Sequence, residues 1–228
     1  RFLDWALFHV EHSYLAEWRD YRRAISQRNV LLKQRSVSQL DVWDAQIAPL
    51  GESINSQRLT LIEKFLPRLQ ALLEQLLPGI EIQFDYKSGW DNEQPLIDVL
   101  TLTRERDLRY GVSLSGPHRA DFSIKVDRHL ATDALSRGQT KMLICALKFA
   151  MGEMVKTNGS PIYLVDDLAS ELDSDNSAKV VSYLFDSKEQ CLFTAITDSA
   201  LNLVSELTTR SGKFHVEHGK ISASPATA

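Results

Sequence analysis

The sequence is poor in cysteine and has no long apolar stretch. Its two cysteines, Cys145 and Cys191, each lie inside an apolar run of the 228-residue chain. That setting is typical of buried, reduced thiols and not of a disulfide framework or paired metal ligands. No apolar run approaches the roughly 18 residues that a membrane-spanning helix needs, and we see no secretory signal. We therefore expect a protein of the cytoplasm with no membrane partner.

A strong charge of one sign is also missing. The net charge is −4, with 43% apolar and 25% charged residues, as in an ordinary globular protein. Bulk charge therefore does not favour a polyanion, and any nucleic-acid surface must be local. The six histidines form no pattern of metal ligands, so we expect no structural metal. Because the chain opens at Arg1 without an initiator methionine, we expect it to be part of a longer protein.

The phosphate-binding motif GxxxxGK[ST] occurs nowhere in the sequence. The nearest string runs from Gly111 to Gly116 and is followed by Pro117 and His118. Proline has no backbone N–H to offer a phosphate, and no lysine stands where the motif requires one. We therefore expect that the chain alone cannot cradle the phosphates of a nucleotide.

The first third of the chain has a helical period. Mostly apolar residues form two stripes at helical spacing: Leu15, Trp18, Arg22, Ile25, Asn29 and Leu32, then Trp43, Ile47, Leu50, Ile54, Leu61 and Phe65. Pro49 and Pro67 should kink or interrupt the second stripe, and Pro78-Gly79 should end the helical region. We predict two or three long antiparallel helices that pack against each other.

Beyond Ile80 the pattern becomes that of strands alternating with helices. Four segments have strand character: residues 80–86, 122–126, 161–166 and 191–196. The last two are continuous apolar runs, which suit parallel strands covered on both faces. Strands that alternate with helices predict an α/β architecture. We expect a mainly helical domain over residues 1–110 and an α/β lobe over residues 111–228.

One strand pattern ends in two acids, Asp166 and Asp167. Carboxylates at the carboxyl end of a strand lie where ligands bind in open α/β sheets. In a nucleotide hydrolase, Asp166 would hold Mg²⁺ and Asp167 would polarise the attacking water. Many strands, however, end in an acid that only caps the next helix. On this motif alone both interpretations stay open.

The string Leu135-Ser-Arg-Gly-Gln139 precedes an amphipathic helical pattern. Ser136 and Gly138 should therefore lie at a helix N-terminus, where free N–H groups and the helix dipole favour a phosphate. A plain serine N-cap would explain the string equally well.

The order of these motifs is more specific than any one of them. LSRGQ, a helix, a strand ending in Asp-Asp and then SELD resembles the signature loop, Walker B strand and D-loop of ABC-type ATPases. The segment 194–198 then resembles the switch segment, with a threonine where transporter ATPases usually carry histidine. The resemblance implies nucleotide contacts from Ser136, Arg137, Gly138, Gln139, Asp173 and Thr197.

A finer resemblance is to the RecF family of bacterial DNA replication and repair ATPases, which belong with the SMC-like proteins. It lies in RFLDWALFHVEHSY, TRERDLRYGVSLSGPHRADF, LSRGQTKMLICALKFAMGE and YLVDDLASELD. One departure is Ala120, where many relatives have aspartate after Arg119. In this family the phosphate loop precedes a helical insertion, the lid. The resemblance thus implies a lid plus the C-terminal lobe of an incomplete P-loop NTPase-like, ABC/SMC-type fold.

The resemblance also implies a function. The intact protein would bind DNA and be a weak ATPase that uses ATP and Mg²⁺, whereas this chain alone would be inactive. ATP sandwiched between two subunits would clamp DNA in recombinational repair of single-strand gaps, replication restart and the SOS response. RecO and RecR would be partners, and RecA loading the outcome. Two alternatives stay open: a non-catalytic DNA-binding or partner-docking module, and another ABC-type lobe, such as that of a transporter, against which Thr197 and the long helical insertion argue.

Positive charge gathers between residues 19 and 35, where Asp20 is the single acid. The basic residues are Arg19, Arg22, Arg23, Arg28, Lys33 and Arg35. One helix face with this bias could follow a DNA backbone, although a solvated face paired with acids elsewhere would look the same. We take Arg19, Arg22 and Arg23 as candidate DNA contacts. His118 and Arg119 could also contact phosphate, link lobe to lid, or only form a turn.

Overall fold

The computed structural model describes residues 2–156, 159–167, 172–196 and 212–223. In chain order the helices are α1 (Phe2–Val10), α2 (Tyr14–Lys33), α3 (Leu40–Leu76), α4 (Leu96–Leu102), α5 (Arg104–Tyr110), the short η1 (Pro117–Arg119), α6 (Ala131–Ala134), α7 (Arg137–Val155) and α9 (Ser174–Asp186). The strands are β1 (Gln83–Lys87), β2 (Asp121–Val126), β3 (His129–Leu130), β4 (Ile162–Val165), β5 (Gln190–Phe193), β6 (Phe214–Glu217) and β7 (Lys220–Ala223). Within these residues no helix is long and apolar enough to cross a membrane.

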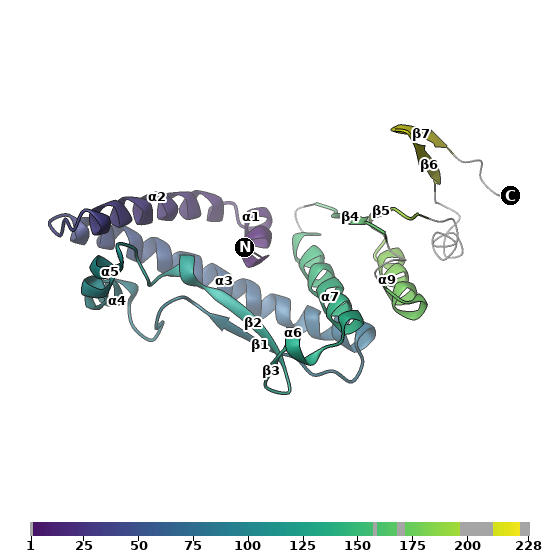
Figure 1. Ribbon diagram of the computed structural model, residues 1–228, viewed down its shortest axis with the longest axis horizontal. Helices are drawn as coiled ribbons and strands as arrows, with labels where there is room; N and C mark the ends of the chain where they lie inside the picture. The colour runs from purple at the N-terminus through teal and green to yellow at the C-terminus, as the bar shows by residue number, and fades with distance from the viewer. Residues whose placement is uncertain (1, 157–158, 168–171, 197–211, 224–228) are drawn as a thin grey trace.

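Two long helices, α2 and α3, lie side by side and form one end of the elongated molecule (Figure 1). Tyr21, Ile25 and Leu32 of α2 are buried, and so are Ile47 and Ile54 of α3. These residues are spaced four or seven positions apart, so each helix turns one apolar face towards the other. The predicted pair of long helices is confirmed.

Proline was expected to kink or interrupt the second helix, and the interruption is wrong. Helix α3 runs unbroken through 37 residues and contains both Pro49 and Pro67. A proline inside a helix removes one hydrogen bond and costs about 3 kcal/mol. Packing on α2, α4 and α7 offsets this cost, because large side chains such as Ile47, Ile54 and Leu69 are buried around both prolines. Each contributes roughly 1.5–3 kcal/mol on burial.

Strands β1, β2 and β3 form a small antiparallel sheet that runs along α3 (Figure 1). Phe84 pairs with Ile124 and Tyr86 with Phe122, and the rings of Phe84 and Phe122 stack with centroids 5.0 Å apart. Both predicted strands are thus present, although the first begins at Gln83 and not at Ile80. The sheet joins residues from before and after position 110, and the domain boundary expected there stays a prediction.

The parallel pair β4–β5 is confirmed, but it is not covered on both faces. Tyr163, Val165, Cys191 and Phe193 pack against the core. On the opposite face, residues of the same strands are 58%, 75% and 51% exposed: Ile162, Leu164 and Leu192. The sequence pattern predicted cover on both faces, whereas among the described residues the core side alone is covered.

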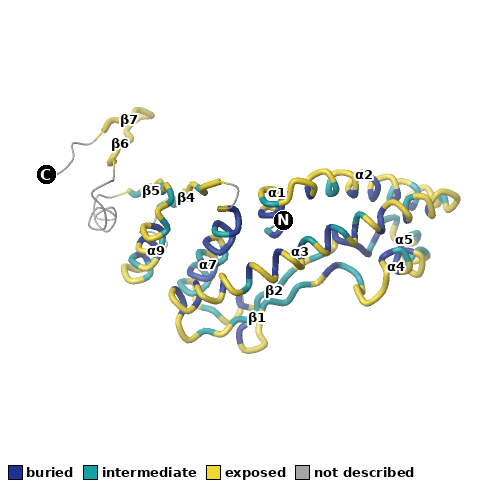
Figure 2. Tube along the Cα trace, turned by 180° about the vertical axis from the view of Figure 1, so that it is seen from behind, coloured by how far each residue is buried: buried dark blue, intermediate teal, exposed yellow. Residues whose placement is uncertain are grey.

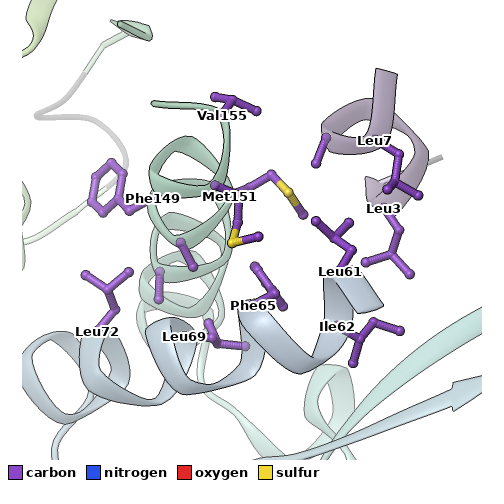
Figure 3. Packing of buried hydrophobic residues seen from close by; sticks show 14 of the residues in the cluster. Leu3, Leu7, Leu61, Ile62, Phe65, Leu69, Leu72, Phe149, Met151 and Val155 are labelled. Carbon is purple, nitrogen blue, oxygen red and sulfur yellow. The ribbon is translucent and has the colours of Figure 1, made fainter. Parts of the chain in front are cut away.

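One apolar core connects α1 and α3 with α7 (Figures 2 and 3). In Figure 3, Phe149 and Met151 of α7 lie above Leu69 and Phe65 of α3. Leu3 and Leu7 of α1 close the other side of this cluster. The helix that follows the LSRGQ string is therefore fixed to the long helical part by buried side chains.

Candidate functional site

Helix α7 begins directly after Ser136, as the sequence predicted. The Ser136 hydroxyl accepts a hydrogen bond from the Gln139 N–H at 3.3 Å, and the Gln139 side chain accepts one from the Ser136 N–H at 2.9 Å. This reciprocal pair is a capping box. Ser136 and Arg137 are exposed, and apart from the adjoining residues and the helix's own backbone no described atom lies within 4 Å of the place that a Cβ on Gly138 would take. The helix N-terminus is thus capped yet open to solvent, and its role towards phosphate stays a prediction.

The acid pair lies at the carboxyl end of β4, beside the parallel strand β5. Asp166 is exposed and follows Val165, which pairs with Phe193 of β5. Asp167 has a positive φ of 48°, in the left-handed region that few residues other than glycine adopt. The structure therefore places both carboxylates at the sheet edge that the sequence indicated, while their roles towards metal and water stay predictions.

Thr194 is a site residue that the sequence reasoning missed. Its hydroxyl donates to Asp166 Oδ1 at 2.5 Å and accepts from the Asp167 N–H at 2.9 Å. Its own backbone N–H donates to the carbonyl of Val165 at 2.9 Å, which continues the β4–β5 ladder by one rung. A signal existed in the sequence, because a hydroxyl residue that ends one parallel strand lies level with acids that end its neighbour.

Of the two remaining candidate nucleotide contacts, the structure describes Asp173 but not Thr197. Asp173 caps α9, because its carboxylate accepts from the Asn176 N–H at 2.8 Å and from the Asn176 side-chain amide at 2.9 Å. A contact between Asp173 and nucleotide stays a prediction. Thr197 lies outside the described residues.

The residues at this edge fit a hard cation that arrives with phosphate. The Asp166 carboxylate and the Thr194 hydroxyl are oxygen donors, the type that Mg²⁺ prefers. Mg²⁺ usually keeps several waters and binds one or two carboxylates plus substrate phosphates. Among the described residues no group of three or more His, Cys, Asp or Glu lies together, so Asp166 would need phosphate and water to complete a magnesium shell.

The Gly-Pro-His-Arg turn is tied to α2. The Tyr21 hydroxyl lies 2.6 Å from His118 Nδ1, and His118 Nε2 lies 3.0 Å from the Ser113 carbonyl. Because a carbonyl only accepts, Nε2 carries the proton and Tyr21 donates to Nδ1. Burial lowers the pKa of His118, which the positive charge of Arg119 lowers further. Both ring nitrogens are thus engaged within the protein, while Arg119 is exposed. Phosphate contacts by either residue stay predictions.

A buried arginine, Arg58 of α3, also holds this turn. It donates to the Pro117 carbonyl at 2.8 Å and to Asp4 Oδ1 of α1 at 2.8 Å. Tyr14 of α2 donates to the same carboxylate oxygen at 2.5 Å, and the Trp18 ring lies 5.2 Å from the guanidinium carbon. Arg58 therefore links the turn to α1, α2 and α3 at one point.

Arg28 must be removed from the set of basic residues on the face of α2. It is fully buried, with ion pairs of 2.6 Å to Asp44 and 2.7 Å to Asp107. A polar residue on a helix can face inward where acids from other elements meet it, and no local pattern reveals this.

An exposed basic stripe nevertheless remains on α2. Arg19, Arg22 and Lys33 are exposed and lie three and eleven positions apart, which places them on one helix face. Arg23 is exposed beside this stripe and forms a 3.7 Å ion pair with Asp20. The described part of α2 can therefore present several cations to a polyanion.

Comparison with known proteins assigns this arrangement to a family. Residues 15–222 match the family described as RecF/RecN/SMC N terminal domain. The DNA replication and repair protein RecF of Stenotrophomonas maltophilia is 44% identical over 230 residues, covering 99% of this chain and 62% of that protein. The RecF protein of Vibrio campbellii is 39% identical over 224 residues, covering 96% of this chain and 62% of that protein. This chain thus spans about 62% of the length of these curated relatives.

A solved structure shares the fold. The recombination mediator protein RecF with ATP, of the RecFOR pathway, superposes with a TM-score of 0.81 at 22% identity, covering 97% of this chain and 61% of that one. At this identity the likeness is one of fold. With the family match, it shows that the predicted α/β fold of an ABC/SMC-type ATPase is correct.

Proposed function

The chain belongs to the RecF/RecN/SMC family, and on that premise we propose that it carries the signature-loop and Walker B half of an ATP-hydrolysing DNA repair protein of the RecF type. Its curated relatives are named DNA replication and repair proteins, which supports a RecF-like role in repair. Residues 1–110 would be the lid and residues 111–228 the lobe. Because the chain lacks GxxxxGK[ST], it would not hydrolyse ATP alone.

The observation that carries this proposal is the placement of two motifs at opposite ends of α7. Ser136 precedes the first residue of α7, whereas β4 lies beside the other end of the helix (Figure 1). Helix α7 has 19 residues. At 1.5 Å per residue, a helix of this size is about 28 Å long. One copy therefore cannot bring Ser136 and Asp166 to the same phosphate. An ATP molecule that contacts both motifs would lie between two copies, which supports an ATP-dependent homodimer.

In such a dimer each residue would have a defined task. Asp167 would orient the attacking water, and Asp166 would hold Mg²⁺, which neutralises charge on the phosphates. The hydroxyl of Ser136 and the N–H of Gly138 would contact the γ-phosphate held by the other copy. The remaining candidate nucleotide contacts are Arg137, Gln139, Asp173 and Thr197.

ATP-driven closure of the two copies would clamp DNA. The basic stripe of α2, with Arg19 and Arg22 exposed, would contact its phosphates. Following the relatives, the task would be recombinational repair of single-strand gaps and replication restart. RecO and RecR would be partners, and loading of RecA the outcome. The work would take place in the cytoplasm, where bacterial DNA lies.

Hydrolysis measured on two forms of the protein tests this proposal. The complete protein should hydrolyse ATP in a Mg²⁺-dependent manner, and Asp167→Asn should abolish turnover. The 228-residue chain alone should show no turnover, because positioning of the phosphates is most of phosphoryl-transfer catalysis. Metal-dependent turnover by this chain alone, lost on Asp167→Asn, would contradict the proposal that the chain carries only half of the ATP-hydrolysis site.

A further inference from the structure

Thr194 binds both members of the acid pair at once. Its hydroxyl donates to the side chain of Asp166 at 2.5 Å and accepts from the backbone of Asp167 at 2.9 Å. A hydroxyl has one proton to give and two lone pairs to accept with, so a single side chain can make both bonds. The backbone of Thr194 is held in turn by its bond to Val165, the last residue of β4.

The backbone of Asp167, which one of these bonds holds, has an unfavourable conformation. Asp167 has a φ of 48°, which costs a residue with a Cβ free energy unless its surroundings hold it. The bond from the Asp167 N–H to Thr194 fixes the peptide that joins the two acids. The direction in which the Asp167 side chain leaves the strand is therefore set by a residue 27 positions later in the chain.

The second bond orients the other carboxylate. A hydrogen bond to Oδ1 fixes the rotation of the Asp166 carboxyl group and uses one of its lone pairs. The remaining lone pairs stay available for a cation or water, because an ionised carboxylate has about four acceptor sites. Asp166 is exposed, and this bond restrains the rotation of its carboxyl group.

We propose that Thr194 is a positioning residue of the hydrolysis centre, which holds the Asp166 carboxylate and the Asp167 backbone in one fixed relation. The inference rests on the proposed function, because Asp166 and Asp167 act on ATP in that account. Thr194 acts through the two aspartates, and the group that matters is its hydroxyl.

Three substitutions in the complete protein test this role. Thr194→Val keeps the shape and removes the hydroxyl, Thr194→Ala removes the whole side-chain end, and Thr194→Ser keeps the hydroxyl. Val and Ala should lower kcat about 10- to 100-fold, the effect of losing one hydrogen bond to a charged catalytic group. The KM for ATP should change less than about threefold, because the bond sets transition-state geometry and not substrate binding. Ser should keep kcat within about threefold of wild type.

A second readout follows the bond itself. In the 15N-labelled complete protein, the Asp167 amide should exchange with solvent about tenfold faster in Thr194→Val than in wild type, and Thr194→Ser should restore its protection. Thr101→Val is the matched control, because the hydroxyl of this exposed threonine donates to the Ile97 carbonyl of its own helix. Thr101→Val should leave kcat and Asp167 exchange unchanged.

The outcomes separate this inference from the proposed function. Asp167→Asn is measured in parallel. If Asp167→Asn abolishes turnover while Thr194→Val and Thr194→Ala keep wild-type kcat, the positioning role is wrong and the proposed function stands. If Asp167→Asn leaves turnover intact, the proposed function itself is wrong. If Val does not fold, a loss of kcat in Thr194→Ala with rescue by Thr194→Ser supports the inference, and equal loss in Ala and Ser contradicts it.

Discussion

The Tyr21 hydroxyl of α2 donates a hydrogen bond of 2.6 Å to Nδ1 of His118, a residue 97 positions later in the chain. Gly116 makes this approach possible, because a Cβ on it would lie 2.6 Å from the Tyr21 hydroxyl. The contact fixes the turn that begins β2 against the long helices. It requires His118 to be neutral at Nδ1.

The first prediction concerns pH. Because burial lowers the pKa of His118, the unfolded chain takes up a proton on this side chain at higher pH than the folded protein does. Stability rises with pH wherever the unfolded state binds more protons, so this contribution is lost as pH falls below the ordinary histidine pKa of about 6.5. Urea unfolding at about pH 7.5 and about pH 5.5 should show a smaller loss of stability for His118→Gln than for wild type. The exposed His12, changed to glutamine, is the control and should leave the wild-type loss intact. An equal loss in His118→Gln would contradict the account.

The second prediction concerns the buried ion pairs of Arg28. Arg28→Met should lower the free energy of unfolding by about 3–5 kcal/mol, because the buried Asp107 would lose its ion pair with Arg28 and Asp44 would keep its pair with Arg104 alone among those described. Arg22→Met, on the exposed face of the same helix, should change it by less than about 0.5 kcal/mol. Equal effects of the two substitutions in urea unfolding would show that the buried pairs do not hold these elements together.

The sequence predicted some features of this structure and missed others, and the difference depends on how far apart in the chain the interacting residues lie. The period of apolar residues predicted α2 and α3, and continuous apolar runs predicted the parallel strands, because both patterns lie in neighbouring positions of the sequence. The effect of Pro49 and Pro67 was misjudged, since the packing that keeps α3 continuous comes from other elements. Arg28 was taken for a surface cation because its partners lie 16 and 79 positions away. Thr194 was missed for the same reason, since Asp166 lies 28 positions before it.

The third prediction concerns the contact between α7 and β4. A Cβ on Gly152 would collide with the hydroxyl of Tyr163, an oxygen that is buried without a hydrogen-bond partner among the described residues. Gly152→Ala should therefore destabilise the protein by about 1–3 kcal/mol. Tyr163→Phe should be neutral or stabilising, because it removes an unpaired buried hydroxyl. In a double-mutant cycle the two changes should couple favourably, and strictly additive effects would contradict the close contact.

The fourth prediction concerns DNA. Replacing Arg22 and Arg23 by alanine should weaken binding to DNA of any sequence, and each lost phosphate contact should reduce the salt slope of log K by roughly one unit. Arg68→Ala is the matched control, because Arg68 is an exposed arginine of α3 that donates to its own helix at Lys64. A salt slope that is unchanged in the double variant would return α2 to the role of a solvated helix face.

The central claim is that Ser136 of one copy and Asp167 of another serve the same ATP. Ser136→Arg and Asp167→Asn are therefore made separately in the complete protein, and each alone should abolish turnover. In a two-fold symmetric dimer of one copy of each, both defects fall on one site and leave the other site intact.

Mixing the two inactive variants in equal amounts tests this claim most directly. If copies mix at random, half of the dimers are mixed and each of these has one intact site, so about a quarter of all ATP sites are intact. ATP hydrolysis should therefore return to about a quarter of the wild-type rate. A mixture that remains as inactive as its two components, while wild-type protein hydrolyses ATP under the same conditions, would contradict the assignment of these two motifs to one shared site.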